Sequence, residues 1–314
     1  MKKGIILLAA ICMSSIMSFA QEIIRVSTNK TDLVMKVSPK GRLYQVYLGD
    51  KLQNPADYEN LKWDVYAASD GAVSQRGHEV YATSGAEDFF EPAVAVTHAD
   101  GNMTTYLYYQ SYEQKAVNGG TETIITLQDK VYPLAVKLYY VAYPKENVIK
   151  AWSEISHKEK SAITLWRYSS TMLYFKSFKY YLTNYHSDWA KEGQPETTQL
   201  STGKKIIDTK LGTRAAMQTE PFFELGFDEP AKENEGKVML GTIGWPGNFR
   251  FTFEVDNVGA LRVIPAINPY ASDYKLNAGE VFTTPEFIFA MSDNGMGEAS
   301  RNLHNWARQY QVNM

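Results

Sequence analysis

The stretch that decides the fold class is residues 249–267: Phe-Arg-Phe-Thr-Phe-Glu-Val-Asp-Asn-Val-Gly-Ala-Leu-Arg-Val-Ile-Pro-Ala-Ile. Two runs rich in aromatic and β-branched residues, Phe249–Val255 and Leu261–Ile267, flank the segment Asp256–Gly259. Such side chains favour pleated strands, and a short Asp/Asn/Gly segment between two such runs is typical of a tight turn. The stretch therefore predicts two successive strands joined by a tight turn.

Runs of the same kind recur through the chain ahead of this stretch. Asn118-Gly119-Gly120 marks a hairpin turn, and no segment before residue 296 has a convincing helical period. Many strands at hairpin spacing favour a sandwich or barrel over a parallel α/β sheet. We therefore predict an all-β fold, a large antiparallel β-supersandwich over residues 21–290. The other predicted strand segments are Ile23–Ser27, Leu33–Val37, Leu43–Leu48, Thr104–Tyr112, Thr121–Leu127, Leu134–Ala142, Val148–Ile155, Ala162–Leu173 and Lys237–Trp245.

Three segments between the predicted strands are polar enough to be interpreted as loops. Gln53–Val73 contains proline, glycine and several acids, and Lys191–Thr209 is rich in glycine, proline and threonine. Phe227–Gly236 is rich in charge. Because their composition suits turns and solvent, we expect all three to lie at the surface.

One helix is predicted, at the end of the chain. Leu303, Trp306, Ala307 and Tyr310 are spaced i, i+3, i+4, i+7, which gives Gly297–Tyr310 a single apolar stripe. The stripe suits two packings: against a following domain, or against the sandwich of the chain itself. We expect residues 291–314 to hold this helix and the start of a linker.

The N-terminus has the pattern of a secretory signal peptide over residues 1–20. Two lysines precede an apolar run, and Ser18-Phe19-Ala20 suits cleavage before Gln21. The run is too short for a membrane span, and a lipoprotein site at Cys12 would need a small residue where Ile11 stands. Cleavage would remove Cys12, the only cysteine. We therefore expect export without disulfides, to a bacterial periplasm.

Composition and motifs exclude several classes of function. A net charge of −3 gives no reason to expect binding to nucleic acid or to an anionic membrane. The five histidines have no close ligand spacing and no cysteine partners, so we expect surface or loop positions and no metal site. No phosphate-binding loop or nucleophile elbow occurs. We expect no cofactor.

The sharpest candidate site is centred on Trp189. The segment Tyr185–Glu192 follows an aromatic-rich strand and reads Tyr-His-Ser-Asp-Trp-Ala-Lys-Glu. A tryptophan flanked by Asp188 and Glu192 in a loop could present its ring to a sugar face while the carboxylates bind hydroxyls. Core packing is the alternative. We predict a substrate-binding role for Trp189, with Asp188 and Glu192 as neighbours.

Several motifs, in order along the chain, resemble the N-terminal β-sandwich of family 36 glycoside hydrolases, the α-galactosidase family. Trp189 and Glu192 match its Gly-x-Trp-x-Arg-Glu segment, with Lys191 in place of the usual arginine, which loses bidentate geometry. Gln218–Phe223 loosely resembles the family's Asn-Pro-Phe element, but Glu220 replaces its asparagine and Met217 stands where the family often has histidine, so the resemblance assigns no polar role to this loop. The other matching segments are Gly85–Ala93, Tyr143–Ile149, Gly244–Phe249, Ile267–Tyr270, Gly279–Glu286 and Ser292–Gly297.

The resemblance implies the front domain of a retaining α-galactosidase that acts on α-galactosides. In that family a following (β/α)8 barrel carries both catalytic carboxylates, so we expect this chain alone to be inactive. The domain would shape the rim of the galactoside pocket, through Trp189 and an acidic residue within Asn54–Ser74, and contribute to homo-oligomer contacts. It would adopt the galactose mutarotase-like sandwich.

One segment of the chain has the residues of a catalytic motif. Leu61–Val65 contains Lys-Trp-Asp, which resembles the motif of the family's nucleophile. However, Asp64 lies far ahead of any barrel, and Tyr66-Ala67 replaces the usual Asn-Arg. We interpret Asp64 as a strand-edge residue. Two alternatives for the whole chain are a stand-alone exported carbohydrate-binding module and an aldose epimerase-like sandwich, but no spacing brings together the histidines and carboxylate that epimerase chemistry needs.

Overall fold

The computed structural model describes residues 22–62, 78–86, 88 and 90–312, with the side chains of residues 215 and 216 excepted. The predicted signal peptide with Cys12, the Lys-Trp-Asp segment from Trp63 onward, and Asp64 lie outside the described residues. The same holds for residues 63–74 of the stretch expected to supply an acidic residue. Among the described residues, no helix combines the length and apolar character needed to cross a bilayer.

Strands dominate the described chain. The structure also has α1 (Pro55–Asn60), the short 3₁₀ helix η1 (Gly212–Met217) and α2 (Gly295–Tyr310). The strands are β1 (Ile23–Ser27), β2 (Thr31–Val37), β3 (Leu43–Asp50), β4 (Val94–Thr97), β5 (Leu107–Val117), β6 (Gly120–Asp129), β7 (Leu134–Tyr143), β8 (Val148–His157), β9 (Ile163–Tyr168), β10 (Leu173–Lys176), β11 (Tyr180–His186), β12 (Gln194–Gln199), β13 (Gly203–Asp208), β14 (Thr219–Phe227), β15 (Val238–Ile243), β16 (Phe249–Val255), β17 (Ala260–Ile267), β18 (Tyr274–Leu276), β19 (Val281–Thr283) and β20 (Phe287–Ser292).

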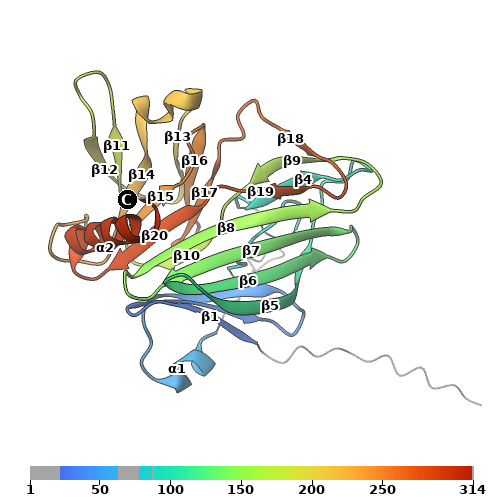
Figure 1. Cartoon of the computed structure of the whole chain (residues 1–314), viewed down its shortest axis with the longest axis horizontal. Helices are drawn as coiled ribbons and strands as arrows, with labels where there is room; N and C mark the ends of the chain where they lie inside the picture. The colour runs from blue at the N-terminus through green and yellow to red at the C-terminus, as the bar shows by residue number, and fades with distance from the viewer. Residues whose placement is uncertain (1–21, 63–77, 87, 89, 313–314) are drawn as a thin grey trace, which may run out of the picture.

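These strands form antiparallel sheets that pack face to face, which confirms the predicted fold class (Figure 1). The largest sheet has the order β12-β11-β14-β15-β20-β8-β7-β6-β5, with β19 added beside β8. A four-stranded sheet, β10-β17-β16-β13, lies against one part of it, and two three-stranded sheets, β1-β2-β3 and β18-β9-β4, complete the molecule. One continuous apolar core joins the sheets.

Both predicted tight turns are present. In the hairpin of β5 and β6, Val117 pairs with Gly120, which leaves a two-residue turn at Asn118-Gly119. Between β16 and β17, the Asp256 carboxylate accepts from the backbone N–H groups of Val258 and Ala260, at 2.9 and 2.8 Å. The side chain of the turn aspartate thus satisfies backbone donors that the strands leave unpaired.

Some predicted loops and boundaries are wrong. The segment Lys191–Thr209 contains β12 and β13, which lie at sheet edges and face mostly solvent, so their polar composition hid their strand character. Ala162–Leu173 is divided between β9 and the beginning of β10. The expectation of no helix before residue 296 missed α1, whose N-cap Asn54 accepts from Ala56 N–H at 3.0 Å, and η1. Both are too short to show a helical period.

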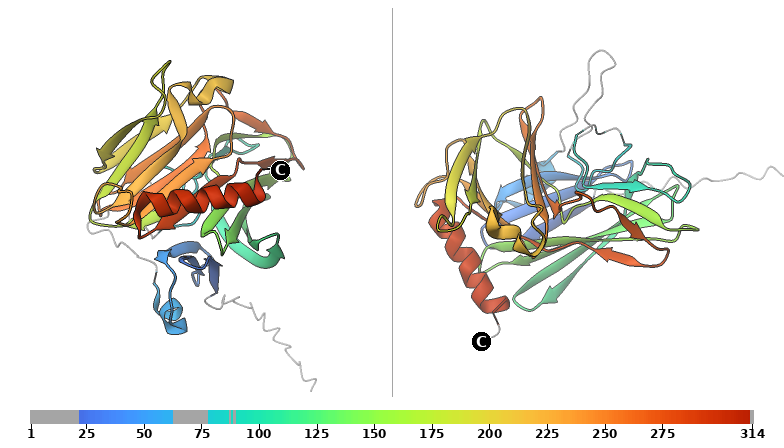
Figure 2. Two further views of the ribbon diagram at one scale, coloured as in Figure 1. Left: turned by 60° about the vertical axis from the view of Figure 1, so that its left-hand side comes forward. Right: turned by 90° about the horizontal axis from the view of Figure 1, so that it is seen from above.

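The predicted C-terminal helix is α2, and its apolar stripe packs on the chain's own sheet. Leu303, Trp306 and Tyr310 contact a cluster on the outer face of β7, β8 and β20 that includes Tyr143. The Trp306 side chain is 6% exposed, and its ring meets the Tyr143 ring edge to face at 5.7 Å. Figure 2 shows the helix lying across this face. Of the two packings considered, the structure therefore has the one in which the helix closes its own sandwich.

Because Trp306 fills a buried contact between α2 and the sheet, Trp306→Ala should lower the free energy of unfolding by about 3 kcal/mol. Chemical denaturation would measure the loss. Arg308→Ala, an exposed substitution on the same helix, is the control and should change stability by less than about 0.5 kcal/mol. Equal stability of the two variants would contradict the assignment of the stripe to the sandwich.

Candidate functional site

Trp189 lies at the tip of the hairpin that joins β11 and β12, at the edge of the largest sheet. Its side chain is 89% exposed, against 45% for Trp166, 36% for Trp245 and 6% for Trp306, while Trp152 is half-buried. Trp189 is thus the most exposed of the described tryptophans. A ring held away from the core is available to a ligand, which is the arrangement that a binding role requires.

A tight turn holds Trp189 in this position. The backbone N–H of Lys191 donates to the carbonyl of Asp188 at 3.0 Å, and the Asp188 carboxylate accepts from the Trp189 N–H at 2.7 Å. Ala190 has φ 57°, in the left-handed region that a non-glycine residue adopts at a cost. One oxygen of the Asp188 side chain is therefore engaged by the turn itself.

A second set of hydrogen bonds ties the hairpin to the next strand. The Ser187 hydroxyl donates to Glu220 at 2.7 Å and accepts from the Gly193 N–H at 3.1 Å. The Ser187 N–H also donates to the carbonyl of Gln218 at 3.0 Å. Ser187 thus connects both arms of the hairpin to the start of β14.

The structure distinguishes among the residues that the sequence singled out. Trp189 and Glu192 are exposed, and Asp188 is exposed with part of its carboxylate in the turn. The sequence did not indicate that Ser187 and Glu220 position the hairpin. Glu220 stands where the family has asparagine, and this departure gave the segment Gln218–Phe223 no predicted role. No sequence pattern could have linked these two residues, because Ser187 and Glu220 are 33 positions apart and meet only in the folded structure.

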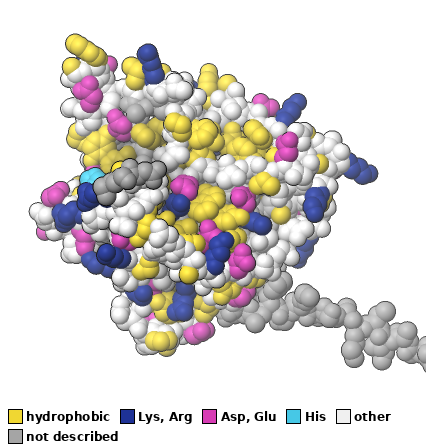
Figure 3. Space-filling view, viewed as in Figure 1, with side chains coloured by type: hydrophobic (Ala, Val, Ile, Leu, Met, Phe, Trp, Pro, Cys, Tyr) yellow, Lys and Arg dark blue, Asp and Glu magenta, His cyan; other side chains and the backbone are white. Residues whose placement is uncertain are grey.

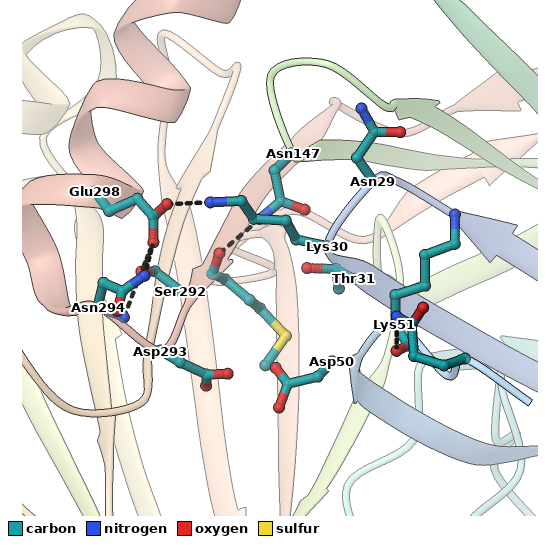
Figure 4. Close-up of a pocket in the computed structure, with 12 residues that line it drawn as sticks. Asn29, Lys30, Thr31, Asp50, Lys51, Asn147, Ser292, Asp293, Asn294 and Glu298 are labelled. Carbon is teal, nitrogen blue, oxygen red and sulfur yellow. Dashed lines mark hydrogen bonds and ion pairs between the residues drawn. The ribbon is translucent and has the colours of Figure 1, made fainter.

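A polar pocket of about 310 Å³ lies elsewhere, between the β1–β2 turn, the end of β3 and the start of α2. Figure 4 shows Lys30 and Glu298 facing each other across it, and they form an ion pair. The Glu298 carboxylate also accepts from the Ser292 hydroxyl at 2.6 Å and from Asn294 at 3.0 Å. These contacts connect the N-terminal sheet with α2.

Two carboxylates, Asp50 and Asp293, face the same pocket (Figure 4). Lys237 Nζ lies 3.5 Å from Asp50 and 3.9 Å from Asp293, so an ammonium group already offsets part of their charge. Burial, followed by the hydrogen bond with Asp50, raises the pKa of Asp293. The described residues contain no group of three or more His, Cys, Asp or Glu side chains arranged to hold a metal ion.

The expectation of surface or loop positions is wrong for His157, which is buried at the end of β8. His98 lies in the loop after β4, as expected, but it is also buried. His98 Nδ1 lies 2.8 Å from Glu159, its Nε2 lies 2.9 Å from the Thr105 hydroxyl, and the imidazole stacks on Tyr132 at 3.6 Å. With both nitrogens engaged and the ring covered, His98 joins loops within the core.

The ion pair of Glu298 predicts a pH dependence of stability. The hydrogen bond from Lys30, with those from Ser292 and Asn294, lowers the pKa of Glu298 to about 2. A carboxyl with a lowered folded pKa contributes stability above its unfolded value of about 4.3, and this contribution is lost as pH falls toward 2. Because Lys30 is exposed, we expect Glu298→Gln to cost only about 1 kcal/mol at pH 7 and much less at pH 2.

Chemical denaturation at both pH values would measure this difference. Glu235→Gln is the matched control, because Glu235 is an exposed glutamate whose one ion pair within the described part of the chain is with neighbouring Lys232. A Glu298→Gln cost that is equal at pH 7 and pH 2 would contradict the role of the ionised carboxylate.

The sequence of the chain is similar to those of known proteins of one family. The family model of the glycosyl hydrolase family 36 N-terminal domain matches residues 41–277. The chain is 30% identical over 243 residues to the α-galactosidase AgaA of Geobacillus stearothermophilus, covering 73% of this chain and 33% of that protein. It is 27% identical over 240 residues to the α-galactosidase Mel36A of Lactobacillus acidophilus, covering 72% and 32%. The chain thus spans about a third of these relatives.

Solved structures agree with the sequence comparison. The α-galactosidase of Lactobacillus brevis superposes with a TM-score of 0.84 at 23% identity, covering 93% of this chain and 42% of that one, which supports the fold. AgaA superposes with a TM-score of 0.83 at 26% identity, covering 91% and 43%. By sequence and by fold, the chain belongs to the family of N-terminal domains of glycosyl hydrolase family 36.

Proposed function

We propose that the chain is the non-catalytic front domain of an exported, retaining α-galactosidase-type glycoside hydrolase. The observation that carries this proposal is the family match over residues 41–277, in a chain that spans about a third of its curated relatives. Those relatives are named as α-galactosidases, and structures of AgaA variants contain raffinose or stachyose. Family membership does not favour the alternative of a stand-alone binding module. Export rests on the signal-peptide pattern of residues 1–20.

In this proposal, Trp189 contributes to the rim of the galactoside pocket. The exposed indole offers a flat apolar face to the C–H groups of a sugar ring and an N–H that can donate to a hydroxyl. Its turn and the Ser187–Glu220 hydrogen bond restrict the loop before any ligand arrives. Restriction of this kind reduces the ordering cost of binding. Glu192 is exposed on the same loop and is the neighbouring acceptor.

Contacts with a second copy of the chain are part of the same proposal. Four large apolar side chains, Leu211, Met217, Trp245 and Tyr270, are exposed in the segments at the end of the sandwich where the hairpin lies. Figure 3 shows hydrophobic side chains over the upper part of the molecule, which is this end, and also over its middle. Several exposed apolar side chains on neighbouring loops are typical of an interface. A dimeric or larger assembly would bury them beside the sugar site.

The chemistry of the proposed enzyme needs two carboxylates on the complete protein's catalytic domain. We therefore expect the 314-residue chain to show no turnover of 4-nitrophenyl α-galactoside. A continuous absorbance assay on the purified chain would test this. Turnover that disappears in Asp64→Asn would overturn the proposal and would make Asp64 the nucleophile.

If Trp189 contacts the sugar, galactose should shift the tryptophan fluorescence of the chain with a dissociation constant in the millimolar range, about 4 kcal/mol of binding. Trp189→Ala should abolish the shift and leave the Tm almost unchanged, because the ring makes little packing contact. Trp166→Ala, which removes another exposed tryptophan, is the control and should retain the shift.

A large fall in Tm in Trp189→Ala, with galactose binding retained, would instead show that Trp189 is a packing residue. The domain assignment would survive that result, because it rests on the family match and not on this side chain.

A further inference from the structure

A second pocket, of about 420 Å³, lies on the outer face of the largest sheet. It is bounded by β14, β15, the loop that joins them and the first half of α2, and every residue that lines it is described. Its volume lies within the range of small-molecule sites, about 300–1,000 Å³. Trp189 does not line it, so this pocket is distinct from the tip of the hairpin.

One side of this pocket is apolar. Phe222 on β14 is half-buried, and its ring packs against Tyr185 with 5.5 Å between centroids. Leu240 and Met296 are buried beside it, where β15 meets α2. An aromatic ring flanked by aliphatic groups provides a surface on which the C–H face of a small ring can stack.

The other side holds three charged side chains that the fold leaves available. The Glu224 carboxylate accepts only the Tyr185 hydroxyl through Oε1, and its Oε2 has no partner among the described residues. In the same described set, the Glu233 carboxylate and the Arg301 guanidinium form neither a hydrogen bond nor an ion pair. Acceptors and a bidentate donor therefore line the pocket with hydrogen-bonding capacity that the described fold does not use.

The balance of charge decides which ligand fits. Burial raises the pKa of Glu224 above its usual value; the hydrogen bond from Tyr185 opposes this shift, and the nearby Glu233 adds to it. The lining combines two carboxylates, Glu224 and Glu233, with the Arg301 guanidinium, so charges of both signs face the pocket. Because each sign of charge would repel one class of charged ligand, this lining suits a neutral ligand whose neighbouring hydroxyl groups can both donate and accept hydrogen bonds.

Gly297 makes the arrangement possible. A methyl group added at this position would overlap the Glu233 carboxylate and come within 3.0 Å of Arg301 Nη1. The bare backbone of α2 thus leaves room for both charged groups at the rim. Since Gly297 has no positive φ and lies inside the helix, alanine there is compatible with the backbone.

We propose that this pocket binds one ring of a neutral sugar. The ring stacks on Phe222, and Arg301, Glu224 and Glu233 bind its hydroxyls. The site is additional to the one proposed at Trp189. It would give the domain a second point of contact with a saccharide.

Methyl NMR can test the proposal, because Met296 lines the pocket. The experiment uses the full chain labelled at the methionine methyl groups. The chain carries Trp189→Ala, so that galactose cannot bind at the hairpin. We expect D-galactose to shift the Met296 signal saturably and to leave the Met291 signal, which belongs to a different pocket, unchanged. Methylammonium and glucuronate, as charged probes, should shift it at least tenfold less at equal concentration.

Arg301→Ala and Gly297→Ala should each raise the dissociation constant for galactose at least tenfold. Arg308→Ala, on the same helix outside the pocket, should leave it unchanged. Gly297→Ala keeps the test valid if loss of Arg301 disturbs folding, because alanine favours the helix. The proposal is overturned if 100 mM galactose leaves the Met296 signal of the folded chain in place, if Arg301→Ala binds normally, or if a charged probe binds better. Failure here leaves the fluorescence result at Trp189 unaffected.

Discussion

The packing of the Phe223 ring between two sheets is the constraint on which the architecture depends. Phe223 on β14 meets Phe251 and Phe253 on β16 at 5.1 and 4.8 Å between centroids, in edge-to-face contacts. Gly241 on β15 is paired with it in register, and a side chain there would collide with the rings of Phe223 and Phe287. The largest sheet can therefore approach the four-stranded sheet closely only because one glycine gives the ring its space.

This inward ring fixes what faces outward. Because strand side chains alternate, burying Phe223 and Leu225 turns Phe222 and Glu224 to the other face. There α2 covers part of the surface and leaves the pocket proposed to hold a sugar ring beside Glu233 and Arg301. The same register places the start of β14 next to the end of β11, so that Glu220 can hold Ser187 and with it the hairpin of Trp189. Core packing thus sets both candidate sites.

The motifs that resemble the family serve the fold more directly than the chemistry. Asp88, within Gly85–Ala93, pairs with the buried Arg262 at 2.8 Å, and the Arg262 guanidinium also lies over the rings of Phe90 and Tyr174. Asn147, in the β7–β8 turn, adopts φ 55° and donates to the carbonyl of Met291 at 2.8 Å. A buried charge needs its partner and a left-handed turn needs a tolerant residue. These motifs therefore identify the domain without locating a ligand.

The sequence by itself determined the all-β class, the turns at Asn118-Gly119 and Asp256–Gly259 and the helix of Trp306, because each follows from local propensity or periodicity. It also singled out Trp189 as a candidate, from its acidic neighbours in a loop. It did not reveal β12 and β13, because edge strands need no apolar face. Nor did it reveal the burial of His98, because its partner Glu159 is distant in sequence. Only the tertiary structure decided that the stripe of α2 packs on its own sheet, that Glu220 holds the Trp189 hairpin, and that Glu224, Glu233 and Arg301 share one pocket. Contacts between distant segments depend on how the sheets pack, and no local pattern encodes that packing.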